Sequence, residues 1–132
     1  MLYFKLLGME INLNCDLGEK SKHHSNENDP ELLKIVNSAN VACGYHAGDE
    51  QTMQEIVKIS KENNVSIGAH PSFKDPENFG RKRMDLSASE ITKLVTDQYE
   101  ILQNIANHQG EKVSHIKPHG ALNNMACEDL EL

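Results

Sequence analysis

The sequence is poor in cysteine, has no excess of positive charge and contains no long apolar run. Its three cysteines, Cys15, Cys43 and Cys127, form no CxxC pair and leave an odd number. This argues against a disulfide framework and predicts a reducing, cytoplasmic location. No run approaches the ~20 apolar residues that a membrane span needs. Acidic residues outnumber basic ones by 20 to 13, so we expect neither a nucleic acid nor a membrane as the main partner.

The remaining composition is typical of one globular domain. The chain has 132 residues, of which 38% are hydrophobic and 25% charged, and this is too apolar for a disordered protein. Residues 1–8 are short and lack the cleavage region of a signal peptide, and Met9 serves equally well as a start. We therefore treat residues 1–8 as an N-terminal extension with no assigned role and residues 9–132 as a single α/β domain.

Strand and helix patterns alternate along the chain. Predicted helices begin at Asp29-Pro30 with Asp29 as N-cap, after the N-cap Asp49, and at the capping box of Ser87 and Glu90. A further helical turn covers residues 121–126. The predicted strands are Glu10–Asn14, Ala39–Cys43, Val65–Ala69 and Val113–Lys117. Four β-α units predict parallel strands in a sheet or barrel, and they amount to about half of a closed barrel of ~250 residues.

Each predicted strand is followed by residues that can carry chemistry. Asp16 follows the first strand, His46 the second, His70 the third, and His119 the fourth, which ends in Lys117. The carboxyl ends of parallel strands meet at one rim, so these side chains are expected to gather there. One carboxylate and three imidazoles predict a divalent-metal or acid–base cluster.

Each of these residues also has a structural explanation when it is taken alone. A single histidine after a strand is more often hydrogen-bonded than catalytic, and Asp16 alone would be explained by a turn. The repetition at four strand ends favours the functional interpretation. The other histidines are predicted to be structural or exposed; they are His23, His24, His108 and His115.

Two further features remain open from the residues alone. The loop that contains Arg81, Lys82 and Arg83 after Gly80 either clamps a carboxylate or phosphate or is simply solvated. Cys15 and Cys43 have no identifiable base partner and are interpreted as small core residues.

Five segments together resemble the LamB/YcsF family. They are Leu13–Glu19 (LNCDLGE), Ser38–Asp49 (SANVACGYHAGD), Ile67–Pro71 (IGAHP), Phe79–Arg81 (FGR) and Ile116–Leu122 (IKPHGAL). The likeness runs from about Met9 to Ala126 and covers the first half of a family member. It implies an irregular seven-stranded β/α barrel related to polysaccharide deacetylases. We expect a partial (β/α) barrel of the glycoside hydrolase/deacetylase type, with parallel strands and a strand-end active site.

The resemblance also implies an activity, cofactors and partners. The family's bacterial members are the A subunit of ATP-dependent 5-oxoprolinase, a hydrolase that opens the cyclic amide of 5-oxo-L-proline to L-glutamate, together with subunits B and C. The implied cofactor is ATP with Mg²⁺, besides a divalent metal at the strand ends. The implied catalytic residues are Asp16, His46, His70, Lys117 and His119; the implied metal ligands are Asp16, His46 and His70; and the implied substrate-binding residues are Arg81, Glu19 and Asp49.

The sequence departs from the family pattern at three places. Lys82 stands where a second arginine is expected, and a lysine cannot form the bidentate contact of a guanidinium. Asn123 stands where a tyrosine is expected. The pattern stops at Leu132, in mid-barrel, which predicts a bare sheet edge that pairs readily with another chain.

Two other functions therefore stand beside the leading one. The first is a metal-dependent deacetylase or amidohydrolase that needs no ATP. The second is a non-catalytic half-barrel, either a fragment or a piece that self-associates or assembles with a second half-barrel. A requirement for ATP separates the first from 5-oxoprolinase, and stability only with a partner identifies the second.

Overall fold

Four parallel strands alternate with four helices in the chain. The structure is a computed structural model that describes residues 11–129, so the predicted extension over residues 1–8 lies outside the described residues. The elements are β1 (Asn14–Leu17), α1 (Asp29–Leu32), β2 (Ser38–Ala42), α2 (Glu50–Glu62), β3 (Ser66–His70), α3 (Ala88–His108), β4 (Val113–Ile116) and α4 (Gly120–Glu128). The strands follow one another in the order β1-β2-β3-β4, all parallel. The predicted partial α/β barrel is confirmed.

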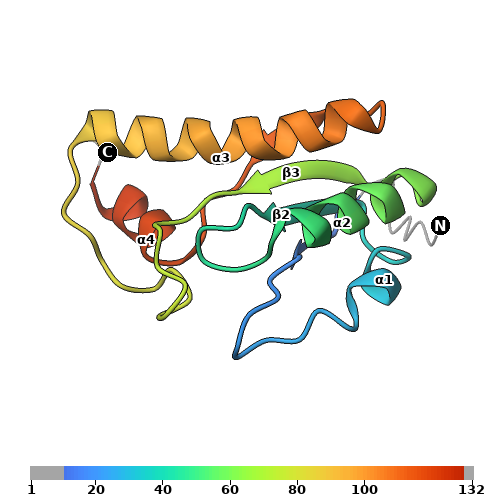
Figure 1. Ribbon diagram of the computed structural model, residues 1–132, viewed down its shortest axis with the longest axis horizontal. Helices are drawn as coiled ribbons and strands as arrows, with labels where there is room; N and C mark the ends of the chain where they lie inside the picture. The colour runs from blue at the N-terminus through green and yellow to red at the C-terminus, as the bar shows by residue number, and fades with distance from the viewer. Residues whose placement is uncertain (1–10, 130–132) are drawn as a thin grey trace.

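One face of the sheet carries the main hydrophobic core. Leu17 of β1, Val41 of β2 and Ile67 of β3 point to this side, where Val57 of α2 and Leu102 of α3 cover them. Each such side chain contributes about 1.5–3 kcal/mol on full burial. Figure 1 shows α3 running along the sheet beside β3. The apolar residues of α2 and α3 recur at helical spacing, and both helices pack with them against the same face of the sheet.

A second, smaller core joins the start of α3 to α4. Phe73 and Ile91 pack there against Ala121 and Leu122. In Figure 1, α4 lies below the N-terminal end of α3. The capping box predicted at Ser87 is present and fixes that end of α3. This core supports the segment that follows β4.

The first β-α unit differs from its prediction at two points. β1 begins at Asn14 and reaches Leu17, whereas the alternation predicted Glu10–Asn14. Asp16 is therefore inside the strand, and the loop after it begins at Gly18. Asp29 was also predicted as the N-cap of α1, but its carboxylate accepts the backbone N–H of Gly18 at 2.7 Å instead. That bond joins residues far apart in the chain, so a local sequence pattern does not predict it. It positions the loop after β1.

The other face of the sheet is polar and has no helix on it among the described residues. Asn14, Ser38, Asn40, Ser66 and His115 line an open hollow of about 450 Å³. Within residues 11–129, no helix is long and apolar enough to cross a membrane. The site described next lies at the carboxyl end of this polar face.

Candidate functional site

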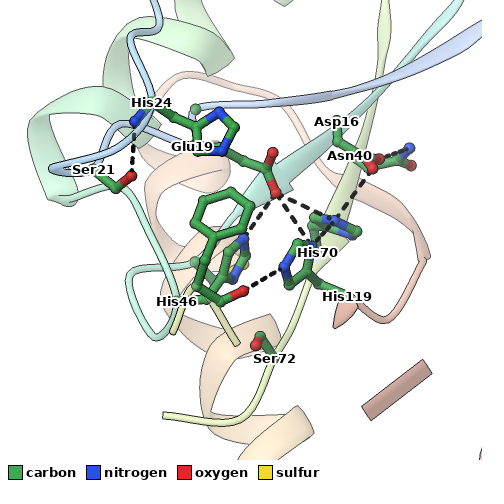
Figure 2. Close-up of polar contacts among 12 residues, drawn as sticks. Asp16, Glu19, Ser21, His24, Asn40, His46, His70, Ser72 and His119 are labelled. Atoms are coloured by element: carbon green, nitrogen blue, oxygen red, sulfur yellow. Dashed lines mark hydrogen bonds and ion pairs between the residues drawn. The ribbon is translucent and has the colours of Figure 1, made fainter. Parts of the chain in front are cut away.

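Four side chains from three strand ends and the start of α4 meet at one point. They are Glu19, His46, His70 and His119, here called the histidine–glutamate cluster. One ligand atom from each lies within 4.8 Å of all the others. Figure 2 shows the Glu19 carboxylate reaching in among the imidazoles. The predicted convergence of the three histidines is thus present, with Glu19 as the carboxylate in their midst.

The Glu19 carboxylate is the common partner of the three rings. Its Oε1 lies 2.9 Å from Nε2 of His46, 3.3 Å from Nδ1 of His119 and 3.6 Å from Nε2 of His70. The three imidazoles are buried, whereas the Glu19 side chain is 20% exposed. Solvent therefore reaches the cluster from the side of Glu19.

Backbone carbonyl groups fix the protonation of two of the rings. Nδ1 of His70 lies 2.5 Å from the carbonyl of Lys117, and Nε2 of His119 lies 2.8 Å from the carbonyl of Phe79. A carbonyl only accepts, so each of these nitrogens carries the proton. The opposite nitrogens, Nε2 of His70 and Nδ1 of His119, then face each other at 3.0 Å. When both rings are neutral, two lone pairs meet there without a hydrogen between them.

Burial keeps these two rings neutral near pH 7. It lowers the pKa of His119 to about 4, and the neighbouring His46 adds to the effect. Burial also lowers the pKa of His70, although the Asp16 carboxylate opposes this. The ring of His46 stacks on that of His119 with centroids 3.9 Å apart. Nδ1 of His46 is buried and has no hydrogen-bond partner within residues 11–129.

Phe79 and Gly80 form one wall of the cluster. The ring of Phe79 meets His46 and His119 edge-on at 5.2 and 5.0 Å between centroids. Phe79 has a φ of 55°, a strained conformation for a bulky residue that costs about 1–3 kcal/mol. That conformation directs its carbonyl at His119. At Gly80 an added Cβ would lie 2.9 Å from Cβ of His46, so a side chain there would displace the ring.

A second polar unit, Asp16 and Lys117, lies beside the cluster. Nζ of Lys117 is 2.6 and 2.8 Å from the two carboxylate oxygens of Asp16, and Asn40 donates to Oδ1 at 2.9 Å. Partial burial acts to raise the pKa of Asp16, but these bonds and the nearby His70 outweigh it and lower the pKa. Asp16 Oδ2 lies 3.5 Å from Nε2 of His70. Asp16 is thus an ionised neighbour of the cluster whose carboxylate is already paired with an ammonium group.

Arg81 and Asp49 lie further out. The guanidinium of Arg81 is exposed and sits over the Phe79 ring at 5.3 Å. The Asp49 carboxylate accepts the N–H of Thr52 and caps α2, as predicted. The predicted roles of both in substrate binding stay predictions. Cys43 is buried, as predicted for a core residue, and burial raises the pKa of its thiol to about 12. Cys15 is only partly buried and packs against the core.

Sequence reasoning missed the residues that support the site through long-range bonds. Gln98 of α3 holds both backbone groups of Ser72, with bonds of 3.0 and 2.8 Å, just after His70. Asn40 joins Asp16 to His115, whose Nε2 lies 2.9 Å from Asn40 Oδ1. His115 is therefore hydrogen-bonded on the polar face of the sheet, as expected of a structural histidine, and is half-buried there. No local pattern tells which residues these side chains contact. The one cue in the sequence is that Asn40 and Gln98 are polar residues within the apolar patterns of β2 and α3.

Comparison of the chain with known proteins shows the family to which it belongs. The model of the LamB/YcsF family matches residues 11–132. The chain belongs to the LamB/YcsF family. It is 45% identical over 124 residues to the A subunit of 5-oxoprolinase from Staphylococcus carnosus (strain TM300), covering 94% of this chain and 49% of that protein. It is also 45% identical to the A subunit of 5-oxoprolinase from Staphylococcus aureus (strain Newman), covering 94% and 50%.

A solved structure is also similar to this chain. The chain is similar to the lactam utilization protein from Thermus thermophilus, with a TM-score of 0.87 and 40% sequence identity. That likeness covers 93% of this chain and 50% of the other. The chain thus spans about half the length of the LamB/YcsF relatives it matches.

Proposed function

We propose that the chain provides the strand-end reaction centre of the A subunit of an ATP-dependent 5-oxoprolinase, which cleaves 5-oxo-L-proline to L-glutamate with ATP hydrolysis. One observation supports this most directly. The acid–base groups gather at the carboxyl ends of the sheet, in a chain 45% identical to proteins named as the A subunit of 5-oxoprolinase. The partners in this proposal are subunits B and C, the cofactor is ATP with Mg²⁺, and the setting is the cytoplasm.

The chemistry that this function requires matches the groups present. A lactam carbonyl is a poor electrophile, so ATP phosphorylates its oxygen, with ADP as the leaving group. Water then adds to the carbonyl carbon, the C–N bond breaks with a proton delivered to nitrogen, and a second water hydrolyses the resulting acyl phosphate to the carboxylate and phosphate. Lys117 stabilises the developing charge on oxygen or phosphoryl, while the paired Asp16 and the cluster histidines move protons. Arg81 holds the substrate carboxylate, with Glu19 and Asp49 as weaker candidates for substrate contact.

The test is release of glutamate from 5-oxoproline in the presence of ATP, Mg²⁺ and subunits B and C. The complete mixture is compared with one that lacks this chain and with one that contains His70→Ala. We expect release only with the unmodified chain. His108→Ala, an exposed histidine at the end of α3, is the matched control and should keep full activity. No release, in an assay where a full-length relative works, would contradict the proposal.

A metal-dependent deacetylase or amidohydrolase that needs no ATP is the second candidate. The histidine-rich cluster favours it, because three imidazoles and a carboxylate are metal ligands. Hydrolysis of an acetylated or cyclic amide without ATP would select this function over the first.

A non-catalytic half-barrel is the third candidate. In the described sheet, β1 and β4 each pair on one side only, and the relatives are about twice as long as the matched region. Such edges pair with a second copy or a second half-barrel. Sedimentation of the chain alone, and mixed with the second half of a relative, distinguishes self-association from complementation.

A further inference from the structure

We propose that the histidine–glutamate cluster is a four-coordinate site for one borderline transition-metal ion, typified by Zn²⁺, with Glu19 rather than Asp16 as its carboxylate ligand. The proposal deepens the proposed function, because it assigns a cofactor to the same strand-end centre. Its test measures metal binding in the absence of lactam and ATP, so the metal site and the proposed function can be refuted separately.

The separations from Glu19 to the three rings, and between His70 and His119, are close to those around a tetrahedral ion. Zinc lies about 2.0–2.2 Å from nitrogen and oxygen ligands, so neighbouring ligand atoms of a regular tetrahedron are about 3.3–3.5 Å apart. The separations from Glu19 Oε1 to the three ring nitrogens are 2.9, 3.3 and 3.6 Å. The nitrogens of His70 and His119 are 3.0 Å apart. The ring of His46 must turn for the ion to bind, because it stacks nearly parallel on that of His119 with centroids 3.9 Å apart, and parallel rings do not aim two nitrogens at one ion.

The hydrogen bonds on the far sides of His70 and His119 supply a second geometric observation. The carbonyl groups of Lys117 and Phe79 hold the protons of His70 and His119 on the far sides of the rings. Such outer hydrogen bonds are the usual means of orienting metal-bound histidines. Two acceptor nitrogens at 3.0 Å repel each other unless a cation lies between them. A metal ion converts this unfavourable contact into two ligand bonds.

The chemistry of the ligands selects the metal class. Imidazole suits Zn²⁺ and its neighbours, whereas Mg²⁺ prefers six oxygen ligands in octahedral geometry. Three of the four ligands here are imidazoles. The cluster is therefore a poor site for Mg²⁺.

Asp16 is a poorer ligand than Glu19 although it adjoins the cluster. Both of its oxygens already bond to Lys117 Nζ, and Asn40 adds a further donor. Glu19 makes its contacts with the three rings and is the exposed member of the cluster. Because four protein ligands fill a tetrahedral site, a substrate group that came from the side of Glu19 would have to add as a fifth ligand or displace that carboxylate.

The experiment is titration of the chelator-treated chain with Zn²⁺, Co²⁺ and Mg²⁺ by calorimetry and, for Co²⁺, by visible absorption. We expect one Zn²⁺ or Co²⁺ per chain, intense absorption bands of a four-coordinate Co²⁺ site, and no tight binding of Mg²⁺. Glu19→Gln and His119→Ala should lose at least about 100-fold in affinity, beyond the 10–100-fold cost of losing an outer hydrogen bond. Asp16→Asn should change affinity by no more than about tenfold.

Two further measurements keep the outcome decisive. His108→Ala controls for adventitious binding by an exposed histidine and should bind like the unmodified chain. Circular dichroism checks that each variant is folded. In the unmodified chain, the ring ¹⁵N shifts of His70 and His119 report which nitrogen of each ring is protonated, and this measurement does not depend on whether His119→Ala folds. Absence of binding, six-coordinate Co²⁺ spectra, or a loss in Asp16→Asn as large as in Glu19→Gln would each overturn the proposal. Metal binding without lactam opening would overturn the proposed function alone.

Discussion

The two faces of the described sheet are built from opposite kinds of residue. The helix-covered face carries Leu17, Ala39, Val41, Ile67, Ala69 and Val113. The other face carries Asn14, Asp16, Ser38, Asn40, Ser66, His115 and Lys117. A parallel sheet with helices on both sides is apolar on both. The polar face is the one that the described helices leave open, so the main hydrophobic core lies on one face and the chemistry gathers at the end of the other.

The largest expected effect comes from a cavity on the apolar face. Leu102 of α3 is fully buried against the sheet. We expect Leu102→Ala to lower the free energy of unfolding by about 2–5 kcal/mol, measured by urea denaturation. Ser66→Ala on the polar face is the matched control, with an expected change within about 0.5 kcal/mol. Equal losses in the two variants would refute the division of roles between the faces.

Acid should weaken the fold through the cluster at the end of the polar face. The pKa of His119 is about 4 in the folded chain against 6.5 for the free group. The unfolded chain therefore binds the extra proton first, so stability is full above pH 6.5, falls as pH drops towards about 4, and then levels off. The loss is on the order of 3 kcal/mol. The lowered pKa of Asp16 adds a further loss below about pH 4.

Urea unfolding at several pH values, in chelator, measures this dependence. His119→Gln should flatten the slope between pH 6.5 and 4, because the titrating ring is gone. A slope that persists unchanged in this variant would show that other groups cause it. Added Zn²⁺ should raise stability where the imidazole ligands of the folded chain are unprotonated, so the gain should fade as pH drops towards about 4.

A smaller effect is expected where the polar face is most crowded. A Cβ at Gly68 would lie 2.1 Å from Nε2 of His115, so Gly68→Ala must displace that ring and break its bond to Asn40. We expect a loss of about 1–3 kcal/mol. The double variant Gly68→Ala/His115→Ala should lose less than the sum of the single changes, because the clash is absent. Strict additivity would show that the ring does not lie over Gly68.

The smallest effect tests a residue that serves only the apolar side. Asp49 caps α2, which covers the core face. Asp49→Ala should cost about 0.5–2 kcal/mol of stability and leave Zn²⁺ affinity unchanged in the titration described above. A loss of affinity or of glutamate release beyond the loss of folded protein would instead support the predicted contact of Asp49 with substrate.

Sequence by itself determined the order of the elements and the rim at which the histidines meet. Hydrophobic period, helix caps and the strand-end motifs are local signals, so α2, β3 and α3 lie close to their predicted bounds. The same signals misplaced β1 and the cap of α1, because the bond from Gly18 to Asp29 spans the loop between them.

Tertiary structure alone decided which carboxylate enters the cluster and which nitrogen of each ring carries its proton. Because β1 continues to Leu17, Asp16 lies in the strand beside Lys117, and Glu19 reaches the imidazoles. The carbonyl groups of Lys117 and Phe79, which come from other segments of the chain, determine which nitrogen of His70 and of His119 carries the proton. Distances of about 3 Å between residues tens of positions apart depend on how the units pack, and a local pattern does not contain them.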